Sequence, residues 1–163
     1  MSAVILPLMR TRSPVCGRRT YGGKTLNRIS ALYSSGFIGE DQKDPPAWLK
    51  ETEEILRGFA TLPEGWDSYE ANSIERHAID FAIELLRRIV QHDTPQPAVV
   101  PTNRGGIQIE WHTRGVDLET EITPHGDLRL LYENPQENAE EEFEPGFDLK
   151  PLADLIATVS PSR

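Results

Sequence analysis

Acidic side chains in the second half of the chain are the residues best suited to chemistry. Glu110, Asp117 and Glu119 lie in two stretches where apolar and polar residues alternate. Clustered carboxylates bind divalent metal ions, and such ions promote phosphodiester hydrolysis. A metal-dependent hydrolase or nuclease that uses Asp67, Glu110 and Glu119 is therefore one hypothesis. Against it, no lysine completes an Asp/Glu-x-Lys motif at 110–121, so we predict neither a metal site nor another cofactor.

The same acids have a second interpretation, as a binding surface. Acidic side chains are typical of the solvated face of an antiparallel sheet. A register in which Trp111 pairs with Val116 places Glu110 beside Asp117. Like charges directly opposite each other repel, and a cationic partner would reduce that repulsion. This interpretation favours a surface that docks a basic partner through Glu110, Asp117, Glu119 and Leu131, where Leu131 is exposed among the charges.

Other catalytic arrangements are absent from the sequence. The histidines are dispersed, and no Ser-His-Asp set can be assembled from them. The stretch Asn103-Arg104-Gly105-Gly106 is a hairpin turn rather than a phosphate loop, because no helix follows it to bind an anion. Whether the protein is an enzyme is left open, with a non-enzymatic role favoured.

The segment Gly65–Tyr69 is the most distinctive loop. It is rich in turn-forming residues, yet it holds an indole and a phenol that would be costly to expose, so we expect an ordered loop. Trp66 is expected to pack at the edge of the core, and Asp67 to accept backbone N–H groups. The functional alternative is a recognition surface that offers Trp66, Asp67 and Tyr69 to a partner.

The periodicity of the apolar residues predicts the elements that hold these groups. Helical spacing predicts two helices, the second one capped by Asn72 with Glu75 three residues later. From Ala98 the period falls to two, and the connections are too short for crossovers, which predicts an antiparallel meander. The expected fold is α+β, a two-layer domain of two helices on a four-stranded antiparallel meander with flexible termini. The predicted ranges are 46–59 and 73–92 for the helices and 98–102, 106–112, 116–123 and 128–133 for the strands.

The two ends of the chain differ from its middle. We expect a disordered basic tail at 1–45, the α+β domain at 46–134, and an acidic linker with a short amphipathic helix at 135–163. Within the tail, residues 1–39 contain six basic residues and no acid, which is also compatible with a transit peptide or an arm that contacts nucleic acid. The amphipathic helix is interpreted either as a third core helix or as a docking element.

Charge and cysteine content restrict the protein's surroundings. Residues 40–163 carry 26 acidic and 11 basic side chains, which argues against DNA binding by the domain itself. Cys16 is the only cysteine, so an intramolecular disulfide is excluded and the composition fits a reducing cytoplasm. No apolar run approaches the length of a membrane span, so we expect a cytoplasmic protein with no membrane contact.

Two motifs at fixed spacing resemble those of a known family. Leu62-Pro63-x-x-Trp66-Asp67-x-Tyr69-x-Ala71 is followed by a long helix and then by Gly105-Gly106-Ile107-Gln108-x-Glu110-Trp111. This pattern resembles a family of small bacterial proteins of uncharacterised activity. Many relatives have Gly where Ser68 or Glu70 stands, so the backbone of this loop has fewer accessible conformations than in those relatives. The resemblance implies a bacterial origin and a cytoplasmic location.

The functional expectation is a small bacterial accessory protein that acts by protein–protein binding, in an antitoxin-like or immunity-like role. This expectation depends on the excess of acidic residues in 40–163 and on the lack of a recognisable set of catalytic residues. The alternatives are the metal-dependent hydrolase or nuclease and nucleic-acid contact through the N-terminal arm. The partner is expected to be a protein, with a basic one favoured, and homo-oligomerisation is left open.

Overall fold

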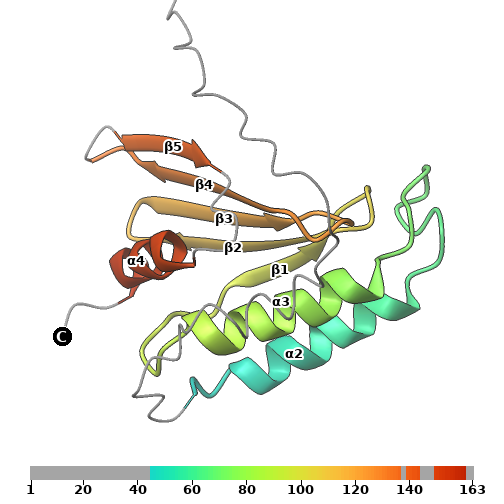
Figure 1. Cartoon of the computed structure of the whole chain (residues 1–163), viewed down its shortest axis with the longest axis horizontal. Helices are drawn as coiled ribbons and strands as arrows, with labels where there is room; N and C mark the ends of the chain where they lie inside the picture. Colours follow the sequence, from blue (N-terminus) through green and yellow to red (C-terminus); the bar gives the residue numbers. More distant parts are fainter. Residues whose placement is uncertain (1–44, 137–138, 144–148, 161–163) are drawn as a thin grey trace, which may run out of the picture.

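In the part of the chain that the structure describes, a five-stranded antiparallel sheet and three α-helices make up the fold (Figure 1). The computed structural model describes residues 45–136, 139–143 and 149–160. The α+β class is confirmed, but the predicted two helices and four strands fall short by one helix and one strand. In chain order the elements are α2 (Leu49–Gly58), the 3-10 helix η1 (Phe59–Thr61), α3 (Arg76–Ile89), β1 (Ala98–Pro101), β2 (Ile107–Thr113), β3 (Val116–Ile122), β4 (Leu128–Asn134), β5 (Ala139–Phe143) and α4 (Lys150–Val159).

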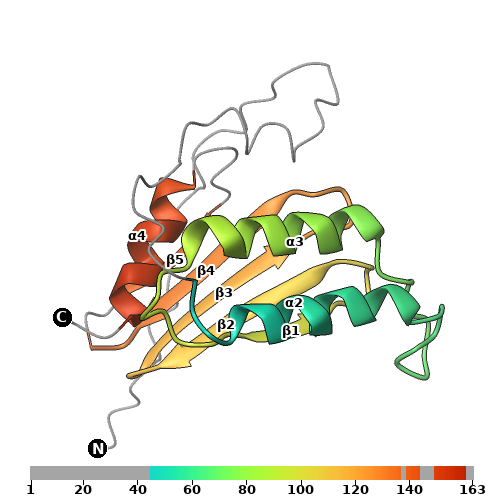
Figure 2. The ribbon, with the colours of Figure 1, turned by 90° about the horizontal axis from the view of Figure 1, so that it is seen from below.

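The strands lie in the sheet in the order in which they occur in the chain, so the predicted meander is confirmed and extended by one strand. Figure 2 shows α2 and α3 lying across one face of this sheet. Apolar side chains alternate with polar ones along β2, β3 and β4, and the apolar set faces the helices. The fully buried side chains that join the two layers include Leu56, Leu85, Leu86, Ile107, Ile109, Trp111, Leu118, Ile122 and Leu130.

The C-terminal helix α4 belongs to this core. Leu152, Ile156 and Val159 are buried in the same apolar cluster as the residues of α3 and β3. Their spacing of three and four residues places them on one side of the helix. Of the two interpretations drawn from the sequence, the structure shows the third core helix.

The start of α3 differs from the prediction. The helix begins at Arg76, and no side chain caps its first turn. The backbone N–H of Asn72 donates instead to the carbonyl of Asn103, and that of Glu75 donates to the carbonyl of Gly105. The predicted capping box is therefore wrong, because residues 72–75 run alongside the β1–β2 turn and use their hydrogen bonds there.

The β2–β3 connection is shorter than the sequence indicated. Only Arg114 and Gly115 separate the two strands, and both have positive φ, at 55° and 76°. Such a tight turn matches the twist of a hairpin. Trp111 consequently pairs with Leu118, and the predicted pairing of Trp111 with Val116 is wrong by two residues. A shift of two leaves every side chain on its predicted face.

The segment after β4 is a strand rather than a solvated linker over part of its length. Residues Ala139–Phe143 form β5, which pairs antiparallel with β4 at the edge of the sheet. Glutamate has a low strand propensity, and three consecutive glutamates hide the alternation that identifies a strand. Backbone pairing with β4 determines the structure here, so the acidic residues extend the sheet. The predicted basic tail lies outside the described residues, except for Pro45.

Within the described ranges, no helix combines the length and the apolar character needed to cross a membrane.

Candidate functional site

The face of the sheet turned away from the helices is the candidate site, and we call it the open face. Register places its side chains in rows that cross the strands. One row runs from Glu110 through Glu119 and Leu131 to Glu142. The residues of the open face on β2 to β5 are Gln108, Glu110, His112, Asp117, Glu119, Glu121, Arg129, Leu131, Glu133, Glu140 and Glu142.

Negative charge dominates the open face. Seven of its residues are acidic, whereas His112 and Arg129 are the only basic ones in the set just defined. Like charges pair directly across the strands, with Glu110 opposite Glu119 and Glu133 opposite Glu140. Such pairs are destabilising, so the face carries electrostatic free energy that a bound cation would release.

His112 is held between two carboxylates. Its Nδ1 lies 2.7 Å from Oδ1 of Asp117, and its Nε2 lies 3.0 Å from Oε2 of Glu110. These hydrogen bonds, first to Glu110 and then to Asp117, raise the pKa of His112 above its ordinary value. The protonated ring can donate to both acids, and its single positive charge then offsets one of their two negative charges.

A hollow with a volume of ≈ 270 Å³ lies in the middle of the open face. Leu131 supplies its apolar surface, and Gln108 donates to Glu119 at 2.9 Å on one side. Arg129 contacts Glu121 at 3.4 Å. Leu131 beside Glu119 and Glu142 suits a lysine or arginine side chain, whose stem packs on leucine while its charged end meets a carboxylate. The full lining is Gln108, Glu119, Glu121, Arg129, Leu130, Leu131 and Glu142.

The loop with Trp66, Asp67 and Tyr69 stands apart from the sheet, beyond the ends of α2 and α3 (Figure 1). Oδ1 of Asp67 accepts the backbone N–H groups of Tyr69 and Ala71, at 2.8 and 3.2 Å, which confirms the predicted turn. The indole of Trp66 is half-buried and donates to the carbonyl of Asn72. Ser68 has a φ of 68°, a conformation that explains why glycine would suit this position.

Tyr69 is the most exposed large side chain of this loop, at 85%. The loop holds it in place through the Asp67 turn, so the phenol is presented to solvent on an ordered backbone. This geometry suits a contact with a partner, since rigid aromatic side chains lose little entropy on binding. The exposed phenol of Tyr69 does not by itself indicate whether such a partner would be acidic or basic.

The sequence-predicted residues therefore fall into two groups. Glu110, Asp117, Glu119 and Leu131 come together on the open face, whereas Trp66, Asp67 and Tyr69 lie in the loop. Asp67 already binds backbone N–H groups, so the structure does not unite it with Glu110 and Glu119 as the hydrolase hypothesis requires. Across the described residues, no group of three histidine, cysteine or acidic side chains could hold a metal ion.

Several members of the open face were missed by the sequence analysis. Glu140 and Glu142 join the face because β5 pairs with β4, whereas Glu133 lies on β4 opposite Asp117. The bridge between Glu110 and Asp117 through His112 depends on the two-residue turn, which places His112 directly opposite Asp117. The signal that could have found it is the Arg114-Gly115 pair, which is compatible with a tight hairpin.

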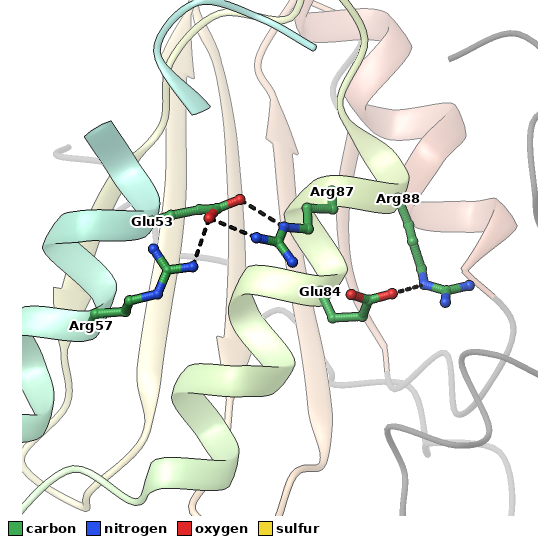
Figure 3. A network of polar contacts seen from close by, with 5 residues as sticks. All are labelled: Glu53, Arg57, Glu84, Arg87 and Arg88. Atoms are coloured by element: carbon green, nitrogen blue, oxygen red, sulfur yellow. Dashed lines mark hydrogen bonds and ion pairs between the residues drawn. The ribbon is translucent and has the colours of Figure 1, made fainter. Parts of the chain in front are cut away.

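A second polar cluster joins the two long helices (Figure 3). Glu53 on α2 receives hydrogen bonds from Arg57 and from Arg87 on α3, while Glu84 and Arg88 form a separate pair along α3. The side chain of Glu53 is only 11% exposed. Because both arginines neutralise this one carboxylate, the cluster stabilises the helical layer and leaves no acid free for catalysis.

Comparisons with known proteins find no relative. No family model matches the chain, and neither the curated proteins nor the solved structures contain a match. The likeness of its two motifs to small bacterial proteins stays a prediction.

Proposed function

We propose that this chain acts by binding a basic protein partner on the open face of its sheet. One observation carries the proposal. In the described part of the chain, all the helices pack on the other face of the sheet, so no helix covers the open face. Seven acids gather on the open face, and three of them, Glu119, Glu121 and Glu142, line a hollow together with Leu131.

The arrangement supports binding in two ways. A surface with one sign of charge attracts an oppositely charged protein and raises the rate of encounter. The hollow around Leu131 then adds a place where one cationic side chain can bury its stem. Charge thus brings the partner to the face, and the hollow fixes its position. A basic toxin is one class of protein that such a face suits, and an antitoxin-like or immunity-like role would then follow.

The test compares two variants of the full chain with equal changes in charge. Glu119→Lys with Glu142→Lys reverses two acids of the open face. Glu51→Lys with Glu54→Lys reverses two exposed acids on α2 and serves as the matched control. Titration calorimetry with a lysine-rich peptide measures the affinity at low salt and at about 0.5 M salt, where exposed charges are screened.

We expect the unaltered chain to bind the peptide in low salt, and the α2 control to keep most of that affinity. The open-face variant should lose at least about tenfold, equal to about 1.4 kcal/mol. Equal losses in both variants would mean that the peptide senses only net charge, which would overturn the proposal. Affinity capture with the same variants then identifies the natural partner as a basic protein that the open-face variant fails to retain.

The hydrolase alternative gains no support from the geometry, because Asp67 is separate from the acids of the sheet. The nucleic-acid alternative concerns the N-terminal arm, which lies outside the described residues.

A further inference from the structure

The open face lacks a cover among the described elements, although it combines charge with apolar surface. The buried apolar residues of α2, α3 and α4 all belong to the core on the other side of the sheet. On the open face, Leu131 is only half-buried, and Val100 at the end of the row through Gln108 is exposed. Carboxylates pair with carboxylates around them. A cover for this face must supply both positive charge and side chains with apolar stems.

The chain itself contains a segment with those properties. Residues 1–39 carry six basic side chains and no acid, in contrast to the excess of acids in the remainder. Four of the six are arginines between positions 10 and 19, namely Arg10, Arg12, Arg18 and Arg19. Arginine binds carboxylates through two parallel N–H groups and packs its stem on apolar surface. This segment therefore matches the open face in charge and in side-chain chemistry.

The length of the chain permits the contact. Twenty-five residues lie between Arg19 and Pro45, where the described part begins. Extended, they reach about 80 Å, whereas a domain of this size has a radius of gyration of about 13 Å. Tethering also keeps the segment at an effective concentration in the millimolar range. The segment then occupies the face for most of the time if the dissociation constant of the pairing is below about 1 mM.

We propose that the arginine-rich segment around residues 10–19 docks on the open face of its own chain and competes there with the basic partner. The competition rests on the proposed function, while the docking itself does not. A basic partner must displace the segment, so the segment lowers the apparent affinity and rejects weakly basic proteins. The N-terminal segment is thus a built-in competitor that sets the threshold for binding.

The docking test uses Cys16, which lies within the arginine-rich segment and is the only cysteine of the chain. A second cysteine is introduced on the open face by Leu131→Cys, or by Glu142→Cys in case the first variant does not fold. Glu54→Cys on the exposed side of α2 is the control. The measured quantity is the fraction of intramolecular disulfide in a glutathione buffer, which gives the effective concentration of the two thiols.

We expect the open-face pair to exceed the α2 pair by about tenfold in effective concentration, and the excess to fall in about 0.5 M salt. Equal values at the two positions, or an excess that salt does not change, would overturn the docking. Disulfides between two chains that increase with protein concentration would also overturn it, since the occupant would then be a second copy.

The competition test replaces Arg10, Arg12, Arg18 and Arg19 by glutamine and measures binding of the lysine-rich peptide. We expect the glutamine variant to bind the peptide about tenfold more tightly than the unaltered chain. Equal affinities would overturn the competition, even where the disulfide test supports docking. No peptide binding by the glutamine variant would overturn the proposed function and the competition together, and the disulfide result would still report on docking alone.

Discussion

Glu53 on α2 and Arg87 on α3 join the two long helices by a pair of parallel hydrogen bonds. Nε of Arg87 lies 2.7 Å from Oε1 of Glu53, and Nη2 lies 2.8 Å from Oε2 (Figure 3). Such bidentate pairs combine charge with fixed geometry. The carboxylate is nearly buried, whereas the guanidinium is half exposed. The pair therefore fixes how α2 lies against α3, which together cover the sheet.

Replacing Glu53 by glutamine should destabilise the fold. The neutral amide cannot satisfy Arg57 and Arg87 together, so we expect a loss of about 1–2 kcal/mol in the free energy of unfolding. Urea denaturation measures it. Glu54→Gln is the control, because Glu54 is exposed on the same helix and should change stability by less than about 0.5 kcal/mol. Similar losses in both variants would show that the Glu53 pairing is not the cause.

The carboxylate of Glu53 should also make the free energy of unfolding depend on pH. Hydrogen bonds from Arg87, aided by those from Arg57, lower the pKa of Glu53 below its ordinary 4.5, although burial opposes them. A depressed pKa means that the stabilisation is complete above 4.5 and is lost as the pH falls through the lower value of the folded state. Denaturation of the unaltered chain and Glu53→Gln across this range should therefore give curves that converge on acidification. Curves that stay parallel would contradict the assignment.

His112 should show the opposite pH dependence. Its pKa is raised by Glu110 and Asp117, so its stabilising contribution is complete below 6.5 and is lost as the pH rises through the folded-state value. The effect on stability is small because the ring is half exposed, so NMR titration of the ring protons is the better measurement. Glu110→Gln should bring the pKa of His112 back toward 6.5. Glu119→Gln is the control, since Glu119 bonds Gln108 instead.

The faces of the strands could be predicted from the sequence, but the contacts across them could not. Alternation alone determines that Ile109 and Trp111 face the core while Glu110 faces solvent. The row in which Glu110 lies depends on the length of the β2–β3 turn, and turns of two or four residues fit the same alternation. A slip of two residues changed every predicted pair between β2 and β3, but it left each side chain on its predicted face.

Two further features had no local signal. The strand β5 contains three consecutive glutamates, so neither its propensity nor its alternation indicates a strand, and only pairing with β4 reveals it. Glu53 and Arg87 are 34 residues apart. Their contact depends on the packing of α2 against α3, which no short stretch of sequence encodes. The open face and the helix pair were therefore only partly accessible to sequence reasoning.

Thr120 places an unsatisfied hydroxyl group in the core. Its hydroxyl is fully buried on β3, and it has no hydrogen-bond partner among the described residues. Valine has nearly the same shape and removes the unsatisfied group, so Thr120→Val should stabilise the fold by about 1 kcal/mol. Thr123→Val is the control and should destabilise it, because that hydroxyl accepts the backbone N–H of Asp127. Thermal or urea denaturation distinguishes the two, and a destabilised Thr120→Val would indicate an unseen partner such as water.

The two glycines of the β1–β2 turn should tolerate no side chain. A Cβ on Gly106 would collide with the backbone carbonyl of Ile122, and one on Gly105, where φ is 90°, would lie 2.8 Å from the carbonyl of Ser73. Backbone cannot move aside as a flexible side chain can. We expect Gly106→Ala to cost about 3 kcal/mol or more.

Gly58 at the end of α2 provides the matched control, because a Cβ there meets nothing within 4 Å. Gly58→Ala should stabilise the fold by about 0.5 kcal/mol through its better helix propensity. Urea denaturation of both alanine variants measures the contrast. If Gly106→Ala unfolded at the same urea concentration as the unaltered chain, this would contradict the close contact between Gly106 and the backbone of Ile122. The position of the β2 end of the open face would then need revision, because that contact places Gln108 opposite Glu121.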